Sequence, residues 1–196
     1  MKSPPTIYHM PAEWHLHQSC LLIYPHNTGV FRTDPSISNV SCGPARLEMR
    51  NLARAICNIG KEDVILICNT QKDADELLLE LDNESTDSDS QDDKIIVRVC
   101  SSDDSWCRDT GPTFVFGTQD GKTKIVGLDW KFNAYGGPED GCYWPCLKDQ
   151  ALAKNIISVL NKEGHDIDHK PVDMILEGVS PPAFEVFNHE FQFKPL

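Results

Sequence analysis

The sequence predicts a mixed α/β fold, because short apolar runs with the length of buried strands alternate with stretches of helical periodicity. A hairpin pattern interrupts this alternation, which favours β-rich repeats over a doubly wound dinucleotide-binding fold. The 196 residues contain neither a Gly-x-Gly-x-x-Gly motif nor a P-loop. A chain of this length can bury a core as one domain or as part of a larger one.

Three buried strands and two helices are expected in the first half of the chain. Pro25 ends the first apolar run, while Ser41 and Pro44 are placed to begin the first helix, which Gly60 ends. Thr70 is a suitable N-cap for the second helix. The strands are predicted at residues 20–24, 64–68 and 95–99, and the helices at residues 44–60 and 70–81.

An acidic segment with few apolar residues, 82–94, follows the second helix. Its six acids and one Lys contribute −5 to the net charge of −12. We expect a disordered insertion there, because such a segment cannot pack against a core. After it, the sequence predicts a hairpin of strands 113–116 and 125–130, a Gly- and Pro-rich loop at 133–145, a helix at 147–160 and a strand at 174–176.

Composition narrows the class of partner. A net charge of −12 is unfavourable for binding nucleic-acid phosphates and mildly favourable for a cationic ligand. No apolar run is long enough to span a bilayer, and residues 1–5 begin no apolar leader, so we expect neither a membrane partner nor secretion. The eight cysteines form no Cys-x-x-Cys pair, which gives little support for zinc and favours reduced thiols in the cytoplasm.

The most informative segment is residues 103–112, which places Trp106, one Arg and three carboxylates between two strand-like runs. A planar organic cation needs such a set, because carboxylates accept hydrogen bonds from its N–H groups and an indole face attracts its delocalised charge. Asp109 and Trp106 are the candidates for this role. The alternatives are a structural Asp109, paired with the neighbouring Arg or with main-chain N–H groups, and a Trp106 in the core. Asp103 and Asp104 are expected to be turn and cap residues.

Five sequence blocks, in order along the chain, indicate a family. They are Met10-Pro11-Ala12-Glu13-Trp14 with His17, Tyr24-Pro25-His26-Asn27, Trp106 to Thr113, Asp129 to Gly137, and Leu176-Glu177-Gly178. With these blocks the chain resembles agmatine deiminases, in the guanidine-modifying superfamily that also contains peptidylarginine deiminases and arginine deiminase. The resemblance covers nearly all of residues 8–178. Tyr135 stands where the family usually has a Trp.

This resemblance implies a fold and an activity. The fold is an α/β propeller of the pentein type, built from five ββαβ repeats, of which this chain has roughly half. The activity is hydrolysis of agmatine to N-carbamoylputrescine and ammonia, a step of putrescine biosynthesis in polyamine metabolism. A Cys thiolate attacks the guanidinium carbon and a His acts as acid and base, with no metal or cofactor implied. The residues that match substrate-binding positions are Asp109, Trp106 and Glu177.

The resemblance ends after Gly178. The family continues with Gly-Gly-Ser, a His-x-Asp pair and a nucleophilic Cys, and no catalytic residue of this set is matched here; Cys107 and His189 are poor substitutes. We therefore expect residues 1–178 to form the N-terminal part of an agmatine deiminase-like domain, residues 179–196 to be a non-family tail, and this truncated chain to be inactive alone. The alternatives are a non-catalytic fragment that binds guanidines or associates with full-length subunits and, more remotely, a bacterial-type peptidylarginine deiminase. The expected partners are a small cationic guanidine and a second copy of the chain in a homo-oligomer.

Overall fold

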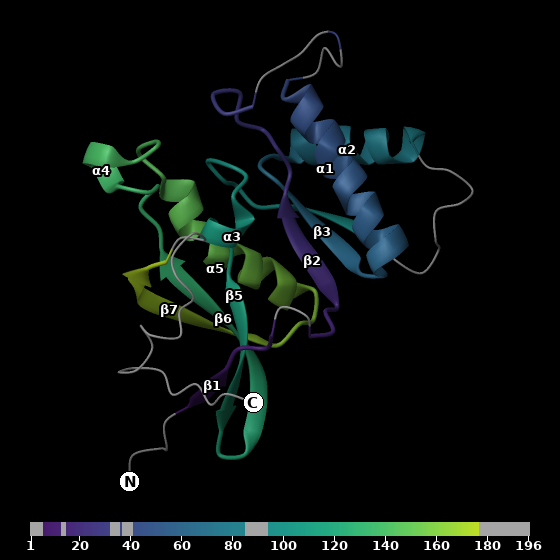
Figure 1. The fold of residues 1–196 in the computed structure, drawn as a ribbon. Coiled ribbons are helices and arrows are strands. Elements are labelled where there is room, and N and C mark those ends of the chain that lie inside the picture. Colours follow the sequence, from purple (N-terminus) through teal and green to yellow (C-terminus); the bar gives the residue numbers. More distant parts are fainter. Residues whose placement is uncertain (1–5, 13–14, 32–35, 37–40, 85–93, 177–196) are drawn as a thin grey trace. The chain divides into compact units, whose positions relative to one another are not determined.

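The computed structural model describes residues 6–12, 15–31, 36, 41–84 and 94–176 (Figure 1). The chain divides into two compact units, and each is described by itself. The parallel unit comprises Leu16–Cys107, and the mixed unit comprises Met1–His15 together with Arg108–Leu196. No helix in the described ranges combines the length and apolar character that a membrane crossing requires.

The parallel unit is a βαβαβ arrangement around a three-stranded sheet, in the order β2-β3-β4 with all strands parallel. Alternate side chains of the central strand, Val64 and Leu66, pack with Ala53 and Leu77 of the two helices to form the core. The elements are β2 (Ser19–Ile23), α1 (Gly43–Ala55), a π-helical turn (Ile56–Gly60), β3 (Asp63–Cys68), α2 (Gln71–Asn83) and β4 (Ile95–Val99).

The helix ends agree only in part with the sequence prediction. Thr70 caps α2 as predicted, because its Oγ1 accepts the main-chain N–H of Asp73 at 3.1 Å. The prediction for Ser41 is wrong: Cys42 is the N-cap of α1, in a left-handed conformation with φ of 58°, and no side chain caps the first turn. Helical structure extends through Gly60 as expected, although the last turn is a π-helix.

The first residues of the predicted acidic insertion are part of a helix end, contrary to expectation. Residues 82 and 83 belong to α2, and Glu84 is its C-cap, where it is paired with two arginines of α1. The end of α2 and its C-cap therefore replace the first three residues of the predicted disordered stretch, and the charge-assisted bonds of Glu84 to two arginines stabilise this end. The rest of the insertion, 85–93, lies outside the described residues, as does the predicted tail at 179–196.

The mixed unit holds a four-stranded sheet in the order β1-β5-β6-β7. The predicted hairpin is confirmed, with β5 and β6 antiparallel around Asp120 and Gly121, whose φ angles are 51° and 75°. β7 pairs parallel to β6, so that β5, β6, α5 and β7 make a ββαβ unit. The elements are β1 (Ile7–His9), β5 (Thr113–Gln119), β6 (Lys122–Lys131), α5 (Leu147–Lys162), β7 (Ile167–Ile175) and two single-turn helices, α3 (Cys107–Thr110) and α4 (Gly137–Asp140).

Helix α5 lies across one face of this sheet (Figure 1). The contact is close because Gly127 of β6 has no side chain: a Cβ there would come within 2.4 Å of Ile157 Cδ1. The other face carries an apolar cluster centred on Leu128 and Trp130. Strand β7 begins seven residues before the predicted strand at 174–176. The prediction missed the first half of the strand because that half is mostly polar and includes Pro171. A proline is tolerated there because β7 is an edge strand of the described sheet.

Candidate functional site

Polar loops gather at one edge of the parallel sheet. Because β2, β3 and β4 run parallel, their carboxyl ends meet at the same edge, which in open α/β sheets is the usual place for a ligand. Tyr24-Pro25-His26-Asn27 follow β2, Asn69 and Thr70 follow β3, and residues 100–106 follow β4. The candidate Trp106 therefore lies in a loop that starts from this edge.

Three hydrogen bonds fix the start of that loop. His26 Nε2 and Ser102 Oγ are 3.0 Å apart, and Asn27 Nδ2 donates to the carbonyl oxygen of Asp103 at 3.0 Å. The main-chain N–H of Ser102 donates to Asn69 Oδ1 at 3.1 Å. Residues from the ends of β2 and β3 thus hold the loop that follows β4, and we name these three bonds the loop clamp.

The Ser102 and His26 pair has the spacing of a nucleophile and its base, but it is not placed to act as one. Ser102 is fully buried, with 0% of its surface exposed, so no substrate carbon reaches its Oγ. The pair therefore serves the loop clamp. This finding leaves the chemistry of the edge to the residues farther along the loop.

Trp106 is half-exposed, and its indole edge is bonded to a buried carboxylate. Its side chain shows 49% exposure, so the alternative of a core aromatic is wrong. Its Nε1–H donates to Asp104 Oδ2 at 2.9 Å, and the main-chain N–H of Ser105 donates to Asp104 Oδ1 at 2.8 Å. Asp104 is 3% exposed and lies in a bend of the loop. The arrangement leaves ring surface of Trp106 open to a ligand.

An arginine of α1 supports the loop after β2. Arg46 Nε donates to the carbonyl oxygen of Pro25 at 2.9 Å, and its terminal nitrogens reach Asp73 at 2.5 Å and Glu76 at 3.0 Å. Burial alone would raise the pKa of Asp73, but hydrogen bonds from Thr70 and Arg46 outweigh it and lower that pKa. Asp73 is therefore held as a carboxylate, and Arg46 is held against the main chain just before His26.

The same pattern repeats along both helices. Arg50 donates to Glu80 at 2.7 Å and to Glu84 at 2.8 Å, and Arg54 donates to Glu84 at 2.6 Å. Hydrogen bonds from Arg50 lower the pKa of Glu84. We name this set the Arg–carboxylate ladder; its members are Arg46, Arg50 and Arg54 with Asp73, Glu76, Glu80 and Glu84.

In the mixed unit, Asp109 lies at the end of the sheet where β5 begins. It belongs to α3 and is 9% exposed. Thr113 pairs with Leu128 in the antiparallel hairpin, and Thr113 Oγ1 accepts the Nε1–H of Trp130 at 2.9 Å. The segment before β5 and the segment after β6 therefore lie at the same end of the sheet. β7 ends there too, since Ile175 pairs with the last residue of β6.

The turn after β6 has an unusual backbone. Ala134 and Tyr135 have φ angles of 56° and 64°, a left-handed conformation that costs an L-residue roughly 1–2 kcal/mol. Asn133 holds the turn, because its carbonyl oxygen accepts the N–H of Gly137 at 2.7 Å and its Oδ1 accepts the N–H of Gly136 at 3.3 Å. Strain of this kind often marks functional positions, and this turn shares its sheet end with Asp109.

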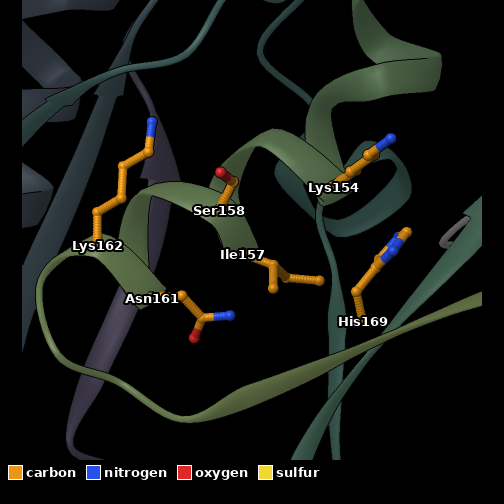
Figure 2. A pocket seen from close by; sticks show the side chains of 6 residues that line it. All are labelled: Lys154, Ile157, Ser158, Asn161, Lys162 and His169. Carbon is orange, nitrogen blue, oxygen red and sulfur yellow. The ribbon is translucent and has the colours of Figure 1, made fainter.

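The mixed unit also has a groove whose charge is wrong for a cationic ligand. It is an open groove of about 420 Å³ between α5 and β7 (Figure 2). Its lining residues include two lysines and no carboxylate, and the nearest acid partner of His169, Asp129 at 2.7 Å from Nε2, is not among them. The ammonium groups of two lysines repel a guanidinium, so we place the candidate site elsewhere. The groove is lined by Lys154, Ile157, Ser158, Asn161, Lys162 and His169.

The predicted site residues have different outcomes. Trp106 belongs to the parallel unit and Asp109 to the mixed unit, and each is described within its own unit. Glu177 and His189 lie outside the described residues. The sequence analysis assigned no binding role to Asp104. The feature that could have indicated one is its position two residues before Trp106, in a loop that follows a buried strand. Among the described residues no group of three or more His, Cys, Asp or Glu side chains is arranged to hold a metal ion.

Comparison with known proteins decides the family. The sequence model of the Porphyromonas-type peptidyl-arginine deiminases matches residues 9–181. The chain belongs to this family. It is 34% identical to the putative agmatine deiminase of Mycoplasma capricolum over 171 residues, which are 87% of this chain and 39% of that protein. It is 32% identical to the agmatine deiminase of Medicago truncatula over 187 residues, 92% of this chain and 43% of that one.

Solved structures related to this family member agree with its fold. A putative agmatine deiminase superposes with a TM-score of 0.68 at 27% identity, over 88% of this chain and 41% of that one. The agmatine deiminase of Enterococcus faecalis gives a TM-score of 0.67 at 26% identity, over 88% and 40% of the two chains. The mixed α/β fold is therefore that of agmatine deiminase structures. The chain spans about two fifths of the length of the curated relatives it matches.

Proposed function

We propose that this chain is the guanidine-binding part of an agmatine deiminase. The observation that carries the proposal is the half-exposed indole of Trp106, bonded at its edge to a buried carboxylate, in a chain that is similar over most of its length to proteins named agmatine deiminase. Asp109, at the end of the second sheet, supplies the carboxylate for the substrate.

The chemistry assigns a role to each group. A guanidinium is planar and delocalises its charge, so the Trp106 face attracts it and a carboxylate such as Asp109 accepts its N–H bonds. The strong resonance of the cation makes its carbon a poor electrophile, so hydrolysis needs an activated thiolate and an acid. In the proposed reaction, agmatine and water give N-carbamoylputrescine and ammonia. No residue of the sequence matches the thiolate or the His-x-Asp pair, so we propose that the chain alone binds agmatine without hydrolysing it.

Further parts of the proposal concern architecture and location. The ββαβ unit of β5, β6, α5 and β7 has the order of elements of one propeller repeat, which supports a partial α/β propeller of the pentein type. The role in putrescine biosynthesis follows from agmatine as substrate. A cytoplasmic location is supported by eight cysteines that are all free thiols. Glu177 remains a proposed substrate contact, and the domain boundary at residue 178 remains a proposal.

A second function deserves a test, because the catalytic residues have no match. As a non-catalytic protein, the chain would bind guanidines or associate with full-length subunits. The bacterial-type peptidylarginine deiminase is a further candidate, since the matching family is described by that activity. The two relatives compared above are instead named agmatine deiminases, one of them as putative. Peptide substrates therefore belong in the same assay as agmatine.

Titration of the chain with agmatine by isothermal calorimetry and NMR tests binding. We expect saturable binding that Trp106→Ala and Asp109→Asn each weaken by roughly tenfold, as expected for losing one ring face or one charge-assisted hydrogen bond. Lys154→Gln, in the groove of Figure 2, is the matched control and should leave affinity unchanged. Binding that both site variants retain in full contradicts the proposal. Ammonia release from agmatine, measured against a buffer blank, decides whether hydrolysis occurs; a peptidyl-arginine substrate run in parallel decides the substrate class.

A further inference from the structure

We propose that Asp104 is the positioning residue that holds the indole of Trp106 in the orientation needed to receive a planar cation. Asp104 contacts Trp106 and not the ligand. The ligand class, a guanidinium, rests on the function proposed above. The positioning role rests on the contacts of Asp104 alone, so the two statements fail separately.

The two oxygens of one carboxylate fix both the backbone and the ring. Asp104 Oδ1 accepts the main-chain N–H of Ser105 at 2.8 Å, which sets the turn. Asp104 Oδ2 accepts the Nε1–H of Trp106 at 2.9 Å, which sets the rotation of the indole about its side-chain bonds. An exposed Trp side chain without such a bond samples several rotamers. At 49% exposure, packing covers only about half of Trp106, so the bond to Asp104 is needed to restrict its orientation.

Asp104 is itself held by the sheet. The loop clamp ties Ser102 and the carbonyl of Asp103 to residues that follow β2 and β3, directly before Asp104 in the chain. The side chain of Asp104 is 3% exposed and does not exchange freely with water. The residues after β2 and β3 therefore fix the position of Asp104, and the carboxylate of Asp104 fixes the orientation of the Trp106 ring.

Charge is the second contribution of Asp104. A carboxylate that accepts an indole N–H forms a charge-assisted bond, roughly twice as strong as a bond to a neutral acceptor. Because the carboxylate is shielded from water, its negative potential extends to the ring face and adds to the attraction of the ring for a cation. Asn at this position keeps the size of the side chain, but its amide NH₂ group is a donor. This NH₂ group would face either the main-chain N–H of Ser105 or the indole N–H of Trp106, which are donors too. Asp104→Asn therefore removes the charge and one of the two bonds.

The test compares Asp104→Asn with Asp103→Asn in the full chain. The control removes the same charge one residue away, and the loop clamp uses the main chain of Asp103, which the substitution keeps. In ¹⁵N spectra the indole Nε1–H signal of Trp106 is assigned by its loss in Trp106→Phe. Two quantities are measured for each variant: exchange of this hydrogen with solvent, and the dissociation constant for agmatine from the shift of the same signal.

We expect Asp104→Asn to move the Trp106 indole signal and to speed its exchange roughly tenfold, the difference between a charged and a neutral acceptor. Agmatine affinity should fall by a similar factor, and Asp103→Asn should change both quantities by less than about twofold. An indole signal and exchange rate unaffected by Asp104→Asn overturn the positioning role. Equal losses of affinity in the two variants also overturn it, because they indicate net charge and not orientation. If the indole responds as expected but agmatine never binds, the positioning role holds and the proposed function fails.

Discussion

Replacing Arg50 by Met tests whether the Arg–carboxylate ladder stabilises the parallel unit. The side chain of Arg50 is 8% exposed and donates to Tyr24 Oη at 2.9 Å, to Glu80 at 2.7 Å and to Glu84 at 2.8 and 3.1 Å. Met retains the volume of the aliphatic stem without the guanidinium, so the substitution removes the charge and its hydrogen bonds without opening a large cavity.

The magnitude follows from the burial of the partners. Removing one member of a buried ion pair costs about 3–5 kcal/mol, because the other charge is left without compensation. Here Glu80 and Glu84 are 27% and 34% exposed, so water recovers part of their solvation. Tyr24 Oη also continues to donate to Glu80, at 2.8 Å. We therefore expect the free energy of unfolding of the parallel unit to fall by about 2–3 kcal/mol.

The assay must report on one unit, since the chain divides into two. Native-state hydrogen exchange of the β3 amides measures opening of the parallel unit, because β3 is the central strand of its sheet. Lys72→Met is the control: Lys72 is 84% exposed and lies 3.7 Å from Glu76, a surface pair worth less than about 0.5 kcal/mol. If Arg50→Met lowers the stability of β3 no more than the control does, the ladder contributes no more than ordinary surface pairs and the reasoning is refuted.

Three other predictions can be checked by urea unfolding. Gly127→Ala should destabilise the mixed unit by about 1–3 kcal/mol through the clash with Ile157, while Gly60→Ala, where an added Cβ meets nothing closer than 3.9 Å, should be nearly neutral; equal effects would contradict the packing argument. Because the folded-state pKa values of Asp73 and Glu84 are lowered, their contribution to stability is fully present above the unfolded pKa of about 4 and should be lost as pH falls below it and through the lowered folded-state pKa values, with a shallower loss in Glu84→Gln. Ser105→Ala should be neutral or stabilising by up to about 1 kcal/mol, since the buried Ser105 Oγ has no hydrogen-bond partner in the described part of the chain; marked destabilisation would reveal a partner.

Local patterns predicted the buried strands and failed for the polar one. The apolar run at 64–68 is strand β3 because both of its faces are covered, and such strands carry no alternation to misread. The first half of β7 has a single apolar strand residue, Ile167, and the polar residues and Pro171 after it give no strand pattern. It is a strand because β6 supplies main-chain partners from 42 residues away, Ile125 pairing with Ile167. The sequence of the segment alone does not predict pairing with a strand so far away in the chain.

The sequence alone nominates residues for the candidate site, but it does not give the hydrogen bonds that hold them. The composition of residues 103–112 indicates a place for a planar cation, and Trp106 is exposed as that role requires. The loop clamp could not be read in the same way, because His26 and Ser102 are 76 residues apart and meet only when the two strands before them lie in one sheet. The arginines of the ladder do recur at every fourth position of α1, so their stripe is visible in the sequence, but the partners on α2 depend on how the helices pack.

The Arg–carboxylate ladder contacts the chain at Pro25, directly before His26 of the loop clamp. The contacts that stabilise the helix pair are therefore connected to the proposed site. Arg46 uses its terminal nitrogens for carboxylates of α2 and its Nε for the carbonyl of Pro25, directly before His26 in the chain. A helix pair and a sheet edge are thereby connected through one buried guanidinium, 5% exposed. Since His26 belongs to the clamp that precedes Asp104, the orientation of Trp106 depends on a chain of contacts that begins in the helix interface. Two sets of carboxylates in this unit therefore have opposite tasks. Those of the ladder pair with the protein's own arginines, whereas the carboxylate of Asp104 accepts the indole N–H of a half-exposed aromatic ring, whose face is open to a cation from solution.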